Sequence, residues 1–358
     1  MIRWTRRLRV LAGMTIVSMG SGSVAHAAPF HVGDIFAAVG DSNLDGTSEV
    51  RRYSSAGALQ ETLNLTGASG LTTGMAFDGS GTLYATAFSA NLLKTFDKTG
   101  VLLGNFGSGY SMPESIVFDS AGHVYVSSVG GAGIKKFDAA GNLLATYISG
   151  TRVDWMDLAA DQTTMFYTQE LSAISRVDVS TEPGTSLPDF VNTGAANSFA
   201  LRILPGGSVL VANGGDIRLF DASANLVRTY DVTGEDLWFA VNVTPDGTSF
   251  WSGNLQTGNL YQFDIACGGV SACTTTTGFI ATGVPNQQPT RALAGVAIFG
   301  ERTVASTTTT TSTTSTTIPT GCAAAASFAS IDCRLDALIA QVRRQPTSVG
   351  SRRCCCTS

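Results

Sequence analysis

One unit of 40 to 43 residues recurs along the chain and constrains its fold more than any other feature. The clearest copy reads Gly-Met-Ala-Phe-Asp at residues 74–78, and Ser-Ile-Val-Phe-Asp at residues 115–119 repeats it 41 residues later. A glycine and a second apolar segment follow each copy, as in Val-Tyr-Val-Ser at residues 124–127. This pattern predicts a strand, a tight turn and a second strand. Weaker copies begin at Met156, Ala200 and Ala240.

An aromatic residue followed by aspartate marks the second half of the unit. It is followed by a glycine turn and a leucine-rich strand in three copies, whereas the fifth copy has Ala224 in the glycine position. Asp side chains at such turns are expected to accept hydrogen bonds from the turn amides. The six copies are Tyr53-Ser54, Phe96-Asp97, Phe137-Asp138, Val177-Asp178, Phe220-Asp221 and Phe263-Asp264, and the glycines are Gly57, Gly100 and Gly141.

Four short strands per unit and six units predict an all-β fold, a six-bladed β-propeller with four-stranded blades over residues 33–301. The first unit lacks its opening strand, and the apolar segment at residues 293–299 supplies a strand at the other end of the chain. We therefore expect residues 34–64 and 294–299 to share the first blade, which the C-terminal strand closes. Such closure removes exposed sheet edges.

The repeated Gly-apolar-Ala-Phe-Asp, apolar-Tyr-Val-Ser and Phe-Asp segments resemble NHL-repeat propellers and the related gluconolactonase-like superfamily of six-bladed β-propellers. The resemblance covers residues 33–301, most of the mature chain. Because propellers of this kind include binding modules, lyases and lactonases, the resemblance implies the fold and leaves the activity open.

The N-terminus resembles a bacterial export signal. Four arginines, an apolar stretch at residues 10–17 and Ala-His-Ala at residues 25–27 form its three parts. The apolar stretch is shorter than the roughly 20 residues that span a bilayer. We expect a signal peptide at residues 1–27, a mature chain beginning near Ala28, and a secreted, periplasmic or cell-surface protein that is not an integral membrane protein.

The C-terminal part has a different composition. Residues 302–320 are rich in Thr and Ser and predict an extended linker. Apolar residues at helical spacing predict a short helical element at residues 321–344, which either docks on a partner or is the remnant of a lost module. Residues 345–358, with the triplet Cys354 to Cys356, predict a disordered tail.

Charge limits the class of partner. Residues 33–301 hold 25 Asp and Glu against 12 Lys and Arg, so this part should repel nucleic acid and anionic lipid. A monomer that binds a protein, a glycan or a small molecule on one propeller face is the expectation. Cysteines in an exported chain predict disulfides, and the short spacings favour Cys267 with Cys273 and Cys322 with Cys333.

A calcium loop is the most specific local motif. The segment at residues 41–49 has oxygen ligands in the order of calcium-binding hairpin loops of integrin-type propellers, with glycine at its sixth position. Arg52 stands where a helix-flanked calcium hand needs glutamate, and an ordinary hairpin turn is the alternative. The predicted structural calcium ligands are Asp41, Asn43, Asp45, the Thr47 carbonyl and Glu49.

Polar side chains near the starts of the innermost strands form the second candidate site. They predict a ligand-binding rim at the central tunnel, or a divalent metal that activates water if they converge. Phe199, Phe239 and Trp155 align with Glu114 in this interpretation, so only part of the rim is polar. The predicted rim residues are Glu114, Asp154, Asp157, Asn197 and Asp236.

Two functions remain open on the sequence. The first is an exported non-catalytic binding module, with calcium in a structural role. The alternative is a metal-dependent hydrolase or lactonase that uses the tunnel carboxylates. Histidine catalysis has few candidates, because the mature chain contains only His31 and His123.

Overall fold

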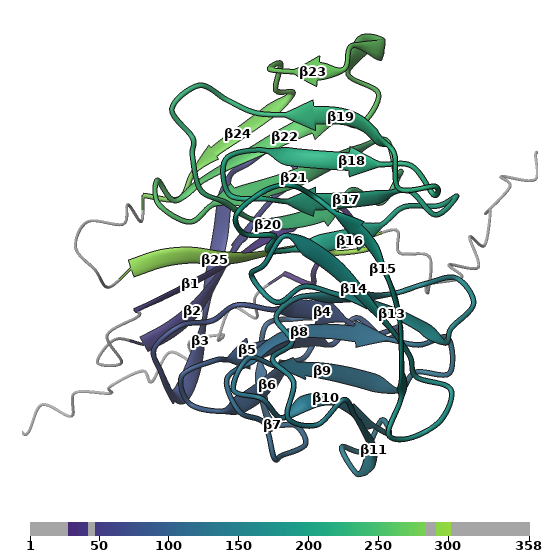
Figure 1. The fold of residues 1–358 in the computed structure, drawn as a ribbon. Coiled ribbons are helices and arrows are strands. Elements are labelled where there is room, and N and C mark those ends of the chain that lie inside the picture. The colour runs from purple at the N-terminus through teal and green to yellow at the C-terminus, as the bar shows by residue number, and fades with distance from the viewer. Residues whose placement is uncertain (1–27, 42–46, 284–290, 302–358) are drawn as a thin grey trace, which may run out of the picture. The chain divides into compact units, whose positions relative to one another are not determined.

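Six antiparallel sheets stand in a ring in the computed structural model, which describes residues 28–41, 47–283 and 291–301 (Figure 1). The six-bladed β-propeller predicted from the repeats is confirmed. The predicted signal peptide, linker, C-terminal element and tail, and the predicted Cys322–Cys333 pair, lie outside the described residues. Over the described part, no helix is long and apolar enough to cross a membrane.

Each blade has four antiparallel strands, and one blade carries an additional outer strand. From the inside outward, the first blade is β25 (Arg291–Ile298), β1 (Ile35–Asp41), β2 (Thr47–Tyr53) and β3 (Leu59–Ser69), and the second is β4 (Met75–Phe77), β5 (Leu83–Ala87), β6 (Leu92–Phe96) and β7 (Leu102–Asn105). The third blade is β8 (Pro113–Phe118), β9 (Val124–Ser128), β10 (Gly133–Phe137) and β11 (Leu143–Tyr147), and the fourth is β12 (Met156–Leu158), β13 (Thr164–Tyr167), β14 (Ala173–Asp178) and β15 (Thr185–Asn192). The fifth blade is β16 (Leu201–Ile203), β17 (Val209–Ala212), β18 (Ile217–Phe220), β19 (Leu226–Tyr230) and β23 (Ala272–Cys273), and the sixth is β20 (Trp238–Val243), β21 (Ser249–Asn254), β22 (Asn259–Asp264) and β24 (Gly278–Ala281).

The fourth strand of each blade is less buried than the strands inside it. Every residue of β5 and of β9 is buried, whereas no residue of the outer strand β7 is. Inner strands lie between two neighbouring sheets and need apolar side chains on both faces. The apolar second segment of each repeat is therefore the centre of its blade. Trp155, Trp238 and Trp251 are buried in the core.

The two ends of the chain close the ring. β25 pairs antiparallel with β1, with Ile298 opposite Ile35 and Val296 opposite Ala37. This confirms the predicted sharing of the first blade. All five apolar side chains of β25 from Leu293 onward are at most 2% exposed, so the closing strand is a core strand.

Aspartate side chains brace the turns between strands, as predicted. The Asp138 carboxylate accepts hydrogen bonds from the amides of Ala140 and Asn142 at 2.9 Å each. The Asn142 side-chain amide also donates to this carboxylate, at 2.8 Å, and these bonds together hold the pKa of Asp138 below its usual value. The same arrangement recurs at Asp78, Asp97, Asp119, Asp178, Asp221 and Asp264.

Ala224 occupies a left-handed turn position that three other blades give to glycine. Its φ is 66°, against 84° for Gly141. A Cβ in this region costs about 1–2 kcal/mol, and glycine loses about 0.5–1 kcal/mol more entropy on folding. We expect Ala224→Gly to stabilise the protein by about 0.5 kcal/mol in urea unfolding. The control Ala222→Gly, where φ is not positive, should destabilise it; equal effects would contradict this account.

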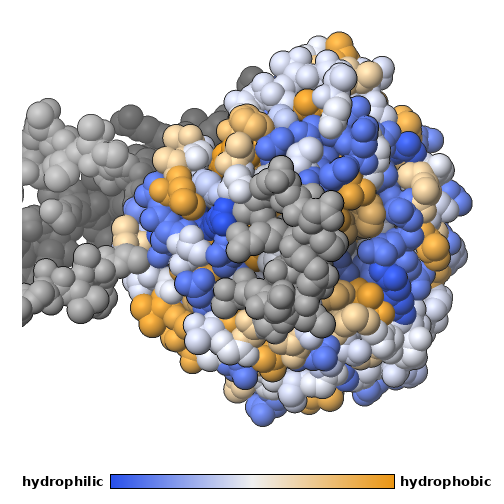
Figure 2. Space-filling model, turned by 90° about the vertical axis from the view of Figure 1, so that its left-hand side faces the viewer, coloured by the Kyte–Doolittle hydropathy of each residue, from blue (hydrophilic) through white to orange (hydrophobic). Residues whose placement is uncertain are grey.

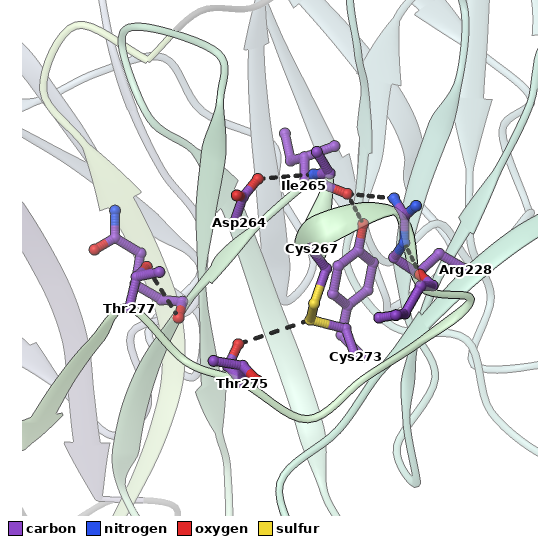
Figure 3. Close-up of a disulfide and its surroundings, with 11 residues drawn as sticks. Arg228, Asp264, Ile265, Cys267, Cys273, Thr275 and Thr277 are labelled. Atoms are coloured by element: carbon purple, nitrogen blue, oxygen red, sulfur yellow. Dashed lines mark hydrogen bonds between the residues drawn. A yellow bond between two sulfur atoms is a disulfide. The ribbon is translucent and has the colours of Figure 1, made fainter.

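A disulfide joins Cys267 and Cys273 in the connection between β22 and β24, which confirms the predicted pair (Figure 3). The 3-10 turn η1 (Cys267–Gly269) begins this connection, and its strand β23 then pairs parallel with β19 of the preceding blade. Arg228 and the Tyr230 hydroxyl both donate to the Ile265 carbonyl. The connection between β22 and β24 therefore covers the outer sheet edge of the preceding blade. Its disulfide is compatible with an oxidising extracellular compartment.

Arg52 binds the first described residues to the first blade. Its buried guanidinium contacts the carboxylates of Asp34 and Glu61, at 2.7 Å each. It also donates to the carbonyls of Ala28 and Pro29, both at 2.7 Å. The next residue, Phe30, lies under the same guanidinium. Arg52 therefore has a structural role at the position where a helix-flanked calcium hand would need a glutamate.

Candidate functional site

The innermost strands all begin at one face of the propeller, which we call the entry face. Figure 2 looks onto the side on which β25 begins, and hydrophilic and apolar residues are interspersed over it. Corresponding positions next to this face are polar in blades two to four and apolar in the others. By strand register and hydrogen bonding they are Ala294, Thr73, Glu114, Asp154, Phe199 and Phe239.

The register corrects one alignment made from the sequence. The main chain of Asp154 donates to Thr168, as that of Phe199 does to Ala212 in the next blade. Asp154, and not Trp155, is therefore the equivalent of Glu114. Two carboxyl side chains from adjacent blades consequently share the polar half of the rim.

Glu114 and Asp154 form a buried acid pair. Their residues are 3% and 0% exposed. Burial, and the negative charges of Asp154 and Glu170, raise the pKa of Glu114 well above its usual value. Burial also raises the pKa of Asp154 to about 6, although the Arg152 guanidinium opposes this change.

One arginine faces these acids. Arg152 Nε lies 2.7 Å from Asp154 Oδ1, and its Nη2 contacts Glu170. The arginine side chain is 41% exposed, whereas that of Asp154 is 1% exposed, so the guanidinium lies between the buried acid and solvent. The sequence analysis missed Arg152 and Glu170; the spacing Arg-x-Asp at residues 152–154 was the available signal.

Two buried polar atoms beside this pair have no hydrogen-bond partner among the described residues. They are Asp154 Oδ2 and the Trp155 indole nitrogen. Buried polar atoms without partners cost free energy and mark positions where a ligand or solvent completes the structure.

The solvent-exposed edge of the site is formed by connections in and after the fourth blade. Glu170 has a left-handed φ of 55°, a conformation that favours glycine, and the neighbouring Leu171 is 59% exposed. The Asn197 amide donates to the carbonyl oxygens of Ala196 and Glu170 at 2.9 and 3.0 Å. The predicted rim residue Asn197 thus lies at the edge of the acid site.

The other two predicted rim residues lie elsewhere. Asp157 lies three residues further along its strand, where its Oδ2 accepts a hydrogen bond from the Ile203 amide and burial raises its pKa to about 6. Near it, Arg202 pairs with Glu301 at 2.9 Å, a contact that the sequence analysis missed. Asp236 is exposed on the connection before β20.

Aromatic rings fill the apolar half of the rim. The Phe199 and Phe239 rings lie 4.8 Å apart, and Trp155 packs edge-on against Phe239 at 6.2 Å. All three are at most 7% exposed. Among the described rim positions, this half therefore presents apolar side chains, and the carboxyl side chains lie in the other half.

The predicted calcium loop is described only at its two ends. Asp41 ends β1 and Thr47 begins β2, both at the entry face, while Asn43 and Asp45 lie outside the described residues. Glu49 Oε1 accepts hydrogen bonds from Arg51, with Nε at 2.8 Å. Of the proposed ligands, Glu49 therefore already has a cationic partner.

The described residues contain neither a cluster of metal ligands nor a histidine pair. No group of three or more His, Cys, Asp or Glu side chains is placed there to hold a metal ion. His123 Nδ1 lies 2.8 Å from Asp119, and His31 lies beside Asp34 in a different blade. The two histidines consequently do not form a catalytic pair.

Comparisons with known proteins agree with the fold. No protein-family model and no curated protein matches the chain. A solved structure of a nidogen/laminin complex is similar at 13% identity and a TM-score of 0.57, covering 74% of this chain and 98% of that one. A protein of unknown function from Bacteroides caccae gives 14% identity and a TM-score of 0.55, covering 76% and 99%.

A streptogramin B lyase structure is also similar, at 14% identity and a TM-score of 0.51, covering 75% of this chain and 89% of that one. At such identities the likeness shows the β-propeller fold alone. The NHL-repeat and gluconolactonase-like resemblance is thus supported at the level of the propeller and not at that of a subfamily. The neighbours include an enzyme, so the site has to decide the function.

The raised pKa of Asp154 should make the free energy of unfolding depend on pH. Because the folded pKa of Asp154 is raised to about 6, its contribution to stability is present below about pH 4 and is lost as pH rises through about pH 6. Asparagine cannot ionise, so Asp154→Asn avoids the stability that the parent protein loses when Asp154 becomes charged. We expect the free energy of unfolding of this variant to exceed that of the parent protein by about 2 kcal/mol near pH 7.5. Urea unfolding between about pH 4.5 and pH 7.5 measures it.

The matched control is Asp236→Asn, because Asp236 is exposed on the same face. Its unfolding free energy should follow that of the parent protein at every pH. An Asp154→Asn variant that is less stable than the parent near neutral pH would show that the buried carboxylate is fully compensated.

Proposed function

We propose that this chain is an exported, non-catalytic binding module that holds its ligand at the entry face, over the third and fourth blades. The observation that supports this most is the buried acid pair of Glu114 and Asp154 with unpartnered polar atoms beside it. Such a pair lowers the stability of the free protein. Destabilising groups of this kind are concentrated at functional sites.

The donor set favours binding over metal-dependent hydrolysis. A catalytic metal needs about three protein ligands around one point and an open position. The predicted carboxylates do not meet at one point, because Asp157 lies further along the tunnel and Asp236 is exposed on a loop. Glu114 and Asp154 remain adjacent, and the nearest further carboxylate, Glu170, is paired with Arg152.

A selection of ligands tests the proposal. Peptides from a random library and glycans on an array are probed with the parent protein, with Leu171→Asp and with Leu143→Asp. Leu171 is 59% exposed beside the acid site, and Leu143 is 53% exposed on an outer strand away from it. Ligands of the entry face should bind Leu171→Asp at least about tenfold more weakly and Leu143→Asp normally.

Two results would contradict the proposal. One is a selection in which every ligand binds Leu171→Asp as tightly as the parent protein. The other is a selection that yields no ligand above background from either library.

We also propose that calcium binds the loop between β1 and β2 in a structural role. The alternating oxygen ligands in the sequence from Asp41 to Glu49 support this proposal. The segment connects β1, which pairs with the closing strand β25, to β2. Calorimetric titration with calcium should show one site in the parent protein and none in Asp45→Ala. Absence of heat in the parent protein would end this proposal without affecting the binding face.

A further inference from the structure

Arg152 is the cation that lies beside the buried acid pair. It stands two residues before Asp154 in the chain, and this short connection lets Nε reach only Oδ1 of that carboxylate at 2.7 Å. Asp154 Oδ2 stays without a partner within the described part of the protein. A guanidinium that approached from solvent would be free to donate to both oxygens at once, the geometry that such pairs prefer.

The charges around Arg152 are unbalanced. Glu114, Asp154 and Glu170 all act on the same cluster, and Arg152 is the cation that interacts with them. Acids in excess over cations in a buried site favour binding of a further positive charge.

Access to the acids is controlled by Arg152. Its side chain is 41% exposed and that of its second partner, Glu170, is 33% exposed. Partly exposed ion pairs contribute only about 0–1 kcal/mol and exchange readily. The exposed Leu171 beside Glu170 offers an apolar surface to an alkyl chain.

We propose that Arg152 is a tethered occupant of a cation site formed by Glu114, Asp154 and Glu170, and that the ligand inserts a guanidinium group in its place. This inference rests on the proposed binding role of the entry face and names the chemistry of its ligand. The ligand class is an alkylguanidinium, such as an arginine side chain of a protein partner.

Calorimetric titration with n-butylguanidinium tests the site on the folded protein. Arg152→Ala removes the internal competitor, so it should bind n-butylguanidinium at least about tenfold more tightly than the parent protein. The double variant Arg152→Ala/Asp154→Asn should lose this binding. Arg176→Ala is the matched control, because Arg176 is an arginine over Phe166 whose loss opens no acid site; it should bind as the parent does.

The geometry of the cation has its own measurement. n-Butylammonium has the same chain without the planar fork and should bind Arg152→Ala at least about tenfold more weakly. In the parent protein, saturation with n-butylguanidinium should shift the Arg152 Nε–H resonance from its bonded position, which reports displacement even if Arg152→Ala fails to fold.

The inference is overturned if Arg152→Ala binds n-butylguanidinium no better than the parent protein, if both cations bind equally, or if the Arg152 resonance stays unchanged at saturation. Its failure differs from that of the binding role. Selected ligands that lose affinity for Leu171→Asp but carry no cation would support the binding face and contradict the guanidinium site.

Discussion

A chain that ends before Leu293 should not fold. The truncation removes β25, whose side chains Leu293, Val296 and Ile298 are at most 1% exposed. Burial of each such side chain contributes about 1.5–3 kcal/mol, so their loss alone amounts to about 5–9 kcal/mol. That is comparable to the entire stability of a protein, about 5–15 kcal/mol. The unpaired edge of β1 would in addition invite aggregation.

The measurement is solubility and resistance to limited proteolysis, compared with a chain that ends after Glu301. The longer chain keeps β25 and the contact of Glu301 with Arg202, and it should be soluble and resistant. If the truncated chain is also soluble and protease-resistant, the closing strand is dispensable and our account of the first blade is wrong.

Among substitutions that add one methyl group to a glycine of the propeller, we expect Gly295→Ala to lower stability the most. A Cβ at this position would lie 1.8 Å from the Thr73 carbonyl oxygen and 2.9 Å from the Ala38 Cβ. The first of these is a main-chain atom of the second blade, so relief requires the inner strands to separate. We expect a loss of roughly 3–5 kcal/mol in the free energy of unfolding.

Gly79→Ala is the control, because a Cβ there would meet no atom within 4 Å. Its melting temperature should change little, whereas that of Gly295→Ala should fall by roughly 10 °C. A second variant, Gly74→Ala, tests the neighbouring contact, since its Cβ would lie 2.1 Å from the Glu114 carbonyl oxygen. Equal melting temperatures for Gly79→Ala and Gly295→Ala would show that the inner strands are not closely packed.

The architecture was predictable because it repeats. Six copies of one pattern identify the strands even where single copies are weak, and the missing first strand of residues 34–64 could be matched to residues 293–299. The turn aspartates were predictable for the same reason. The Arg52 contacts to residues 28 and 29 were not, because nothing local in the sequence links an arginine to a segment 23 residues before it.

The site was only partly predictable. Asp154 and Asp157 look equivalent in sequence, yet successive strand residues rise about 3.3 Å and alternate in direction, so three positions separate them by roughly 10 Å. One therefore joins Glu114 and the other contacts the fifth blade at Ile203. Arg152 and Glu170 join the site from two connections, and the course of such connections follows from tertiary packing and not from the repeat.

The position of the closing strand at the end of the repeats has a consequence for synthesis. Ile298 pairs with Ile35, so the ring stays open until nearly all of the propeller has left the ribosome. Contacts between such distant parts of a chain form slowly. The first blade, and with it the ring, therefore cannot be completed until the last strand of the propeller has been synthesised.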